Sequence, residues 1–126
     1  MKTLITSTII IIVLLITWGI MYDFISQSTE ELNSLVDDME NKVINDNWDS
    51  TMSIYDSIST KWRKKEKIFL LIIDHEEIEK INLTLSKIKK YILIKDKSLS
   101  LSETSALRFF LNHIEEKESL SLKNIF

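Results

Sequence analysis

Two histidines with nearby glutamates are the residues whose types and spacing best fit a chemical role. Glu79 follows His75 by four positions and Glu116 follows His113 by three, so each pair can share one face of a helix. Imidazole and carboxylate groups in this arrangement can bind a divalent metal ion such as zinc. The alternative is structural: His75 also fits the second position of a helix-capping sequence, and a protonated His113 near a helix end would interact favourably with the helix dipole.

Other catalytic arrangements are missing from the sequence. The segment His75-Glu76-Glu77-Ile78-Glu79 differs from the two-histidine zinc protease motif, because its fifth residue is a glutamate. The only glycine is Gly19, which excludes the usual glycine-rich phosphate loop from the rest of the chain, and no serine lies in a nucleophile-elbow context. The chain also has no cysteine. We therefore expect no enzymatic activity, no catalytic residue and no cofactor.

The two histidines can meet only if helices position them. The polar segment Lys95-Asp96-Lys97-Ser98 predicts a turn between two helices. His75 lies 21 residues before Asp96 and His113 lies 17 residues after it, so an antiparallel hairpin would bring both near the same end of the domain.

Composition predicts an all-α fold. The chain has no proline and a single glycine, so it lacks the residues that mark the many tight turns of a sheet protein. About 100 residues follow an apolar N-terminal segment, which is enough for one compact domain.

Apolar residues recur at helical spacing in four further segments, which predicts an antiparallel bundle of about four helices. Aromatic residues at this spacing are more typical of a core than of a ligand platform. The predicted core positions are Leu32, Leu35, Val36, Met39 and Val43; Trp48, Met52, Tyr55, Ser59, Trp62, Glu66, Phe69 and Ile73; Ile78, Ile81, Leu85, Ile88 and Ile92; and Leu99, Ala106, Leu107, Phe110 and Ile114.

Capping and turn signals predict where these helices begin and end. Ser28-Thr29-Glu30-Glu31 and Asp74-His75-Glu76-Glu77 both have the spacing of a capping box. A helix can begin at Ser28, or the N-terminal segment can continue through it without a break. Asn45-Asp46-Asn47 predicts the first clear turn.

Two apolar segments extend beyond these stripes and are also predicted to pack against the bundle. The run from Ile68 to Ile73 is apolar on all sides but too short to cross a bilayer, so we predict that its neighbours bury it most fully. Near the C-terminus, Leu120, Leu122, Ile125 and Phe126 could dock back on the bundle.

The segment from Leu4 to Tyr22 contains nineteen residues without charge and predicts a transmembrane helix, with an anchor at residues 1–23 and the bundle domain at residues 24–126. Its aliphatic residues favour insertion into a bilayer by roughly 4 to 6 kcal/mol. Nineteen residues of helix span about 28 Å, close to the hydrocarbon thickness. Trp18 and Tyr22 lie at the far end, where amphipathic rings favour the headgroup level.

The flanking charge predicts the orientation. Lys2 is the cation beside the segment, so by the positive-inside rule we expect a cytoplasmic N-terminus and an extracytoplasmic bundle at the cell membrane. The alternative is a cleaved signal peptide, with Ser26 and Ser28 as the small residues of the cleavage site.

Charge is arranged in blocks within a net charge of −3. An acidic region at residues 23–49 is followed by a basic cluster at residues 61–67, an acidic one at residues 74–79 and a second basic stretch at residues 80–97. A nucleic-acid-binding domain would need a continuous basic surface, so we expect no nucleic acid partner. The blocks predict solvated faces and ion pairs between neighbouring helices.

Several motifs together resemble a domain-of-unknown-function family of small clostridial single-span membrane proteins. They are a short span, the start Asn45-Asp46-x-Trp48, Trp62, the segments at residues 74–78 and 95–98, and the closing residues 120–125. The resemblance covers nearly the whole chain. It implies a single-pass envelope protein of unknown role and implies no catalytic residues.

These observations predict a membrane-anchored, non-enzymatic helical module that binds another envelope protein or forms a homo-oligomer. One alternative is a small ligand-sensing bundle, which would need a sizeable apolar cavity among Tyr55, Trp62, Phe69 and Phe110. The other is the metal site at His75 and His113.

Overall fold

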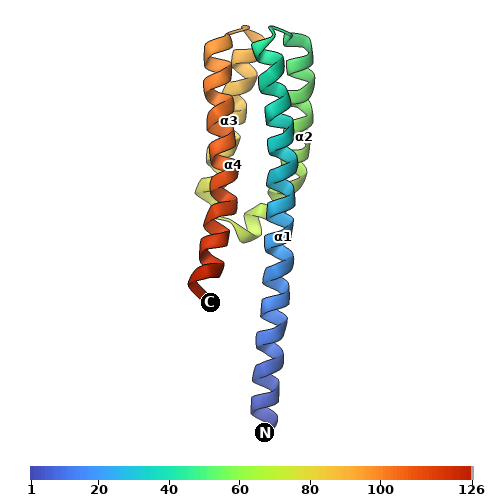
Figure 1. The fold of residues 1–126 in the computed structure, drawn as a ribbon, viewed down its shortest axis with the longest axis vertical. Helices are drawn as coiled ribbons and strands as arrows, with labels where there is room; N and C mark the ends of the chain where they lie inside the picture. The colour runs from blue at the N-terminus through green and yellow to red at the C-terminus, as the bar shows by residue number, and fades with distance from the viewer. Residues whose placement is uncertain (126) are drawn as a thin grey trace.

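The computed structural model describes the backbone of residues 1–125 and the side chains of residues 1–119 (Figure 1). The chain is 92% helical, and the described residues contain no strand. The four helices are α1 (Lys2–Ile44), α2 (Trp48–Ile72), α3 (His75–Leu93) and α4 (Lys97–Ile125). They form the predicted antiparallel bundle, in which α1 packs on α2 and α4, and α3 packs on α2 and α4.

The first helix, α1, extends far beyond the bundle at its N-terminal half (Figure 1). It is long and apolar enough to cross a membrane, a property that secretion signals share, and none of its most apolar window is buried. Its buried residues begin at Ile25. Of the two possibilities for Ser28, the structure has the continuous one: Ser28 and Thr29 lie buried inside an unbroken helix rather than at a helix start.

Two turns at one end of the bundle, here called the distal end, share the same geometry. Asp46 and Lys95 both have φ 56°, in the left-handed region, although neither is glycine. In the first turn the backbone N–H of Asp46 donates to Val43 and that of Asn47 donates to Lys42, which makes a complete Schellman motif. In the second turn the backbone N–H of Lys95 donates to Ile92 and that of Asp96 donates to Tyr91, which makes the same motif. Both predicted turns are confirmed.

The opposite end, here called the base, is where α1 enters the bundle and where α2 connects to α3 (Figure 1). Asp74 is the residue before α3, as the capping signal predicts, but its side chain makes no capping hydrogen bond. The Asp74 carboxylate pairs instead with Lys117 of α4. The ion pair with α4 has therefore replaced the predicted capping hydrogen bond of Asp74.

The core confirms most of the predicted stripes. All five predicted α3 positions are buried, as are Leu32, Val36, Met39 and Val43 of α1 and three of the four aromatic residues of α2, namely Tyr55, Trp62 and Phe69. In α4 the prediction is confirmed at Leu107 and Ile114 but is wrong at the start of the helix, where Leu99 is exposed and Ser100 and Thr104 are buried; Leu111 is buried in addition. The α4 stripe differs because small polar residues, not apolar ones, pack at the start of this helix.

The prediction for the apolar run at the end of α2 is also wrong. Only Phe69 is fully buried there, whereas Ile68, Leu70 and Leu71 are exposed. A helix in a four-helix bundle has neighbours on one side, so a run that is apolar all round leaves its outer residues in contact with solvent. The predicted docking of Leu120, Leu122, Ile125 and Phe126 lies outside the side chains that the structure describes.

Candidate functional site

The predicted metal ligands lie at the base, but the structure does not bring them together. The imidazole Nε2 of His75 lies 3.1 Å from Glu79 Oε1, on an exposed face of α3. His113 Nε2 instead lies 4.0 Å from Glu77 Oε1, and Glu116 is exposed. Among the described residues, no three His, Asp or Glu side chains cluster closely enough to hold a metal ion.

Glu77 is the residue that sequence reasoning missed at this point. It is only 7% exposed, its Oε2 atom has no hydrogen-bond partner among the described residues, and Lys80 Nζ lies 3.6 Å from its Oε1. The sequence feature that could have predicted the burial of Glu77 is its position next to Ile78 and four residues before Ile81, at the edge of the buried α3 stripe.

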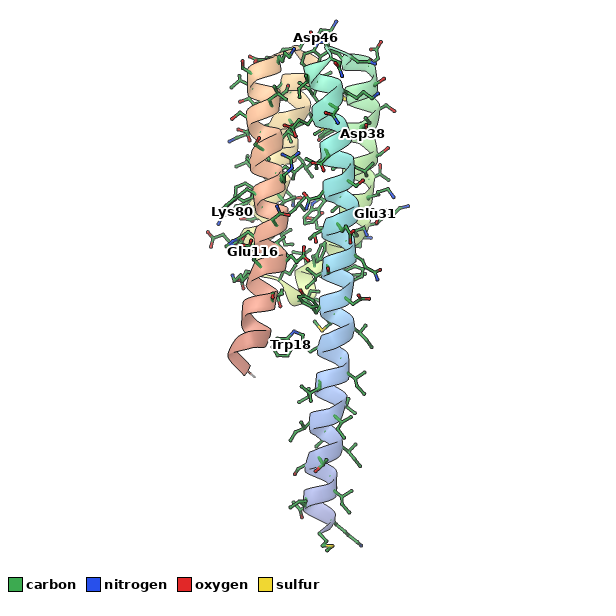
Figure 2. All side chains as sticks on the ribbon, in the orientation of Figure 1. Trp18, Glu31, Asp38, Asp46, Lys80 and Glu116 are labelled. Atoms are coloured by element: carbon green, nitrogen blue, oxygen red, sulfur yellow. The ribbon has the colours of Figure 1, made fainter. Side chains whose placement is uncertain are left out.

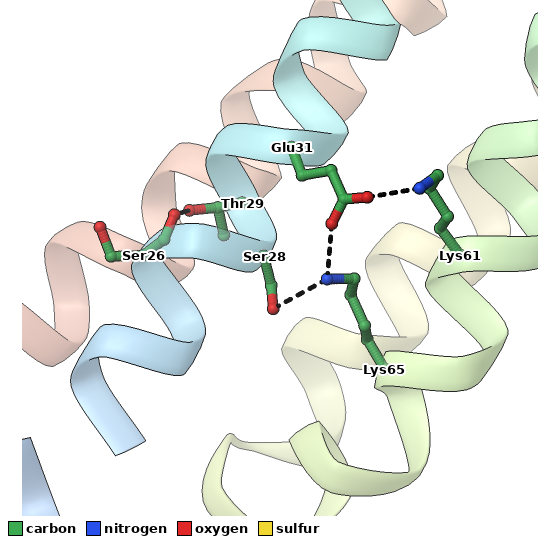
Figure 3. Close-up of polar contacts among 6 residues, drawn as sticks. All are labelled: Ser26, Ser28, Thr29, Glu31, Lys61 and Lys65. Atoms are coloured by element: carbon green, nitrogen blue, oxygen red, sulfur yellow. Dashed lines mark hydrogen bonds and ion pairs between the residues drawn. The ribbon is translucent and has the colours of Figure 1, made fainter. Parts of the chain in front are cut away.

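A cluster of polar side chains lies near the base, and we call it the basal polar layer; Figure 3 shows its members on α1 and α2. It consists of Ser26, Ser28, Thr29 and Glu31 of α1, Lys61 and Lys65 of α2, and Glu115 of α4. These residues connect α1 to two neighbouring helices just after its apolar segment ends.

On one side of α1, two hydroxyl groups hold the Glu115 carboxylate. Ser26 Oγ donates to Oε1 at 3.0 Å and Thr29 Oγ1 donates to Oε2 at 3.0 Å. Thr29 is fully buried, so its hydroxyl group has no access to solvent. This pair of bonds fixes the axial position of α4 against α1, because a shift by one residue would break both.

On the other side of α1, Glu31 accepts hydrogen bonds from two lysines of α2 (Figure 3). Lys61 pairs with its Oε1, and Lys65 Nζ lies 2.9 Å from its Oε2 and 3.2 Å from Ser28 Oγ. The hydrogen bonds from Lys61 and Lys65 lower the pKa of Glu31 from 4.5 to about 2. The carboxylate therefore stays charged across the physiological range.

Ion pairs continue along the α1–α4 contact above this layer. Arg108 of α4 donates to Asp37 Oδ1 at 2.6 Å and also pairs with Glu40, and these bonds raise the pKa of the guanidinium. At the base, the hydrogen bond from Lys117 lowers the pKa of Asp74. These contacts confirm that the charge blocks form ion pairs between neighbouring helices.

Aromatic rings bridge the same region inside the bundle. The Trp62 and Phe69 rings stack with centroids 5.5 Å apart, and Phe69 lies 5.6 Å from Phe24 of α1. Trp62 Nε1 donates to Asn82 Oδ1 of α3 at 2.7 Å. The aromatic residues are therefore core residues, as predicted, and they bind the start of the bundle portion of α1 to α2.

Among the hollows on the described surface, two open grooves involve residues of the bundle core or of the apolar segment. One, of about 350 Å³, lies between α2 and α3 and is lined by Tyr55, Ser59, Trp62, Arg63, Glu66, Asn82, Leu85, Ser86 and Lys89. The other, of about 500 Å³, lies where Glu118 of α4 faces Trp18 and Met21 of α1. Figure 2 shows Trp18 on the side of α1 toward the end of α4, and burial there raises the pKa of Glu118.

This arrangement holds α1, α2 and α4 in register. The basal polar layer uses its charged groups on one another, and the described histidines contact single carboxylates. The hydrogen bonds and ion pairs of the basal polar layer connect α1, just after its apolar segment, to α2 and α4.

Comparison with known proteins shows a match to one protein family. The model of a domain of unknown function, DUF4363, matches residues 19–125, which include the last residues of the apolar segment, the bundle part of α1 and helices α2 to α4. No curated protein and no solved structure matches the chain. The expected resemblance to an uncharacterised family is therefore confirmed, and the chain belongs to the DUF4363 family of proteins of unknown function.

Proposed function

We propose that this protein is a single-pass membrane protein whose bundle is a non-enzymatic module for binding another envelope protein or a second copy of the chain. The observation that carries the proposal is the continuity of α1. One helix contains both the apolar segment, whose most apolar window has no buried residue, and core residues of the bundle from Ile25 to Val43. An anchor of this kind holds the bundle at a fixed height and orientation above the bilayer.

The contacts of residues 24–31 favour an anchor over a cleaved signal peptide. Phe24 packs against the core, Ser26 binds Glu115 and Ser28 accepts a hydrogen bond from Lys65. Cleavage after Ser28 would remove these contacts and would need an extended chain where a buried helix now lies. A bundle that keeps this segment is better packed than one that loses it.

The close packing of the core supports an interaction module rather than a ligand-sensing bundle. The void among Leu32, Ile58, Trp62, Ile81, Leu85, Leu107 and Leu111 has no room for a water molecule. Tyr55 and Trp62 do line a space, but it is the surface groove between α2 and α3, with charged residues at its rim. An apolar ligand would gain little burial in such a groove.

Labelling of single cysteines in intact cells tests the anchor and the orientation. Ser102 is exposed on α4 near the distal end, and Thr104 on the same helix is fully buried, so Thr104→Cys is a matched control. We expect Ser102→Cys in the membrane fraction to react with a membrane-impermeant maleimide, and Thr104→Cys to react only after denaturation. Protection of Ser102→Cys until lysis would place the bundle in the cytoplasm, and recovery of a shortened soluble chain would contradict the anchor.

Cross-linking from the same positions tests the interaction. A bifunctional reagent on Ser102→Cys, and on Ser86→Cys in the groove between α2 and α3, should capture one species of defined mass, either a second copy or another envelope protein. If both cysteines react with the reagent and neither captures anything in intact cells, the proposal of an interaction module is wrong.

A further inference from the structure

The outer face of the last two turns of α2 carries an unusual patch. Leu71 is 85% exposed, Ile68 is 47% exposed and Leu70 is 44% exposed. Each of these side chains would be expected inside a soluble protein, where burying a leucine or isoleucine is worth about 1.5 to 3 kcal/mol. Ile68 and Leu71 are three residues apart and share one face, and Leu70 lies about 100° further round the helix, so the patch is an apolar band around the outer side of α2.

Basic residues come directly before this patch. Lys64 and Lys67 are exposed and lie one turn from Ile68 and Leu71 on the same helix face, and Arg63 precedes Leu70 by two turns. Neither Lys64 nor Lys67 makes an ion pair with any side chain of residues 1–119. Read toward the base, the outer face of α2 changes from cationic to apolar within two turns.

The height of the patch follows from the contacts between α1 and α2. Lys61 pairs with Glu31, Lys65 pairs with Ser28, and Phe69 packs on Phe24. Each later residue of α2 therefore lies level with an earlier residue of α1, because the two helices are antiparallel and have the same rise per residue. Continued by two residues, this register places Leu71 level with Tyr22, the last residue of the uncharged segment.

Figure 1 shows the connection from α2 to α3 beside α1 at this height. Trp18 and Tyr22 have the residue types that favour the interface between headgroups and hydrocarbon. Apolar side chains at that height, with lysines and an arginine one to two turns above them, match the pattern of segments that lie in the membrane surface.

From this register we propose that the end of α2 is a second membrane contact, with Ile68, Leu70 and Leu71 inserted among the lipid headgroups and Lys64 and Lys67 on the phosphates. The bundle then rests on the bilayer at two points instead of standing on α1 alone. This inference rests on the proposed membrane anchor. It commits to the lipid bilayer as the occupant of the patch, because α1 fixes the distance of the patch from the bilayer.

Depth measurement by spin labelling tests the contact, since the chain has no cysteine and every label can be placed singly. The full-length protein is reconstituted in vesicles of phosphatidylcholine and phosphatidylglycerol, with a nitroxide at Leu71→Cys and a second reporter at Ile68→Cys. The matched control is Leu93→Cys, because Leu93 is 64% exposed, also ends a helix and lies at the distal end. Ile12→Cys reports on the span itself.

We expect collisions with oxygen to exceed collisions with a water-soluble nickel complex at positions 12 and 71, with a smaller excess at position 68 and the reverse order at position 93. If positions 68 and 71 are as accessible to nickel as position 93 while position 12 is protected, the second contact is wrong and the anchor remains. If position 12 is also accessible to nickel, the anchor itself is wrong.

Discussion

The ring of Phe24 on α1 lies 5.6 Å from the ring of Phe69 on α2, at an angle of 53°. Phe24 follows the apolar segment of α1 by two residues, and Phe69 is completely buried three residues before α2 ends. This contact joins the point at which α1 enters the bundle to the last turns of its neighbour. It also sets the height of every residue that follows on α2.

Removal of the Phe69 ring should destabilise the bundle strongly. Phe69→Ala would leave a cavity between Trp62 and Phe24, and we expect the free energy of unfolding to fall by about 3 to 5 kcal/mol. Denaturant unfolding of the full chain in detergent micelles measures this value. Phe109 is exposed, so Phe109→Ala should change it by only about 0.5 kcal/mol. Equal losses for the two variants would contradict the packing described.

The ion pairs of Glu31 should give the bundle a specific dependence on pH. Because the folded-state pKa is lowered to about 2 from 4.5, the stabilisation is complete above about pH 4.5 and is lost as the pH falls toward 2. Carbon-13 NMR of the Glu31 carboxyl group can follow this titration.

Substitution of the two lysines separates this effect from general acid unfolding. In the double variant Lys61→Met and Lys65→Met, the pKa of Glu31 should return toward 4.5. Lys64 is exposed and makes no contact with Glu31, so Lys64→Met should leave the low value in place. A pKa that stays near 2 without Lys61 and Lys65 would contradict the assigned cause.

Loss of the buried hydroxyl group of Thr29 should lower the stability of the bundle. Thr29→Val keeps the shape of the side chain but leaves Glu115 Oε2 without its donor, so we expect a loss of about 1 to 3 kcal/mol in the free energy of unfolding. Thr60 is exposed on α2, and Thr60→Val should stay within about 0.5 kcal/mol of the original protein. Thermal unfolding followed by circular dichroism tests both, and a neutral Thr29→Val would show that the bond to Glu115 is not formed.

Glycine in the second distal turn should stabilise the protein. Lys95 has φ 56°, a left-handed conformation that costs a residue with a Cβ atom about 1 kcal/mol. Lys95→Gly should therefore raise the free energy of unfolding by about 1 kcal/mol, whereas Lys89→Gly, inside α3 one turn before its end, should lower it by about the same amount. Both variants replace one lysine by one glycine, so opposite shifts in melting temperature would show that the local backbone conformation causes the difference. A decrease for both would contradict the turn geometry.

Zinc should not bridge the two histidines. His75 contacts Glu79 and His113 faces Glu77, so each ring has one carboxylate neighbour, and tight zinc sites need three or four protein ligands. Isothermal titration calorimetry with zinc should give the same trace for the original protein and for the double variant His75→Ala and His113→Ala. A stoichiometric, tight binding event that the double variant loses would establish a metal site.

Much of the architecture follows from local pattern. The spacing of Ile78, Ile81, Leu85, Ile88 and Ile92 predicts the buried face of α3, and polar segments predict both distal turns, because helical periodicity and turn preference are properties of neighbouring residues. The charge blocks predict ion pairs between helices. The sequence alone does not say that Glu31 meets Lys61 and Lys65, because that depends on the register of α1 against α2.

Tertiary structure decided the features that depend on where a neighbouring helix lies. Nothing in the sequence distinguishes the buried Phe69 from the exposed Leu71, since both belong to one apolar run and only the position of α1 covers one side of it. Asp74 has a local capping partner available, yet Lys117 of α4 takes its carboxylate. The continuity of α1 through Ser28 and Thr29 was likewise open, and it is favoured by the burial of both side chains against α2 and α4. A short pattern fixes the periodicity of a helix, whereas the partner of each side chain is fixed only when the helices pack in register.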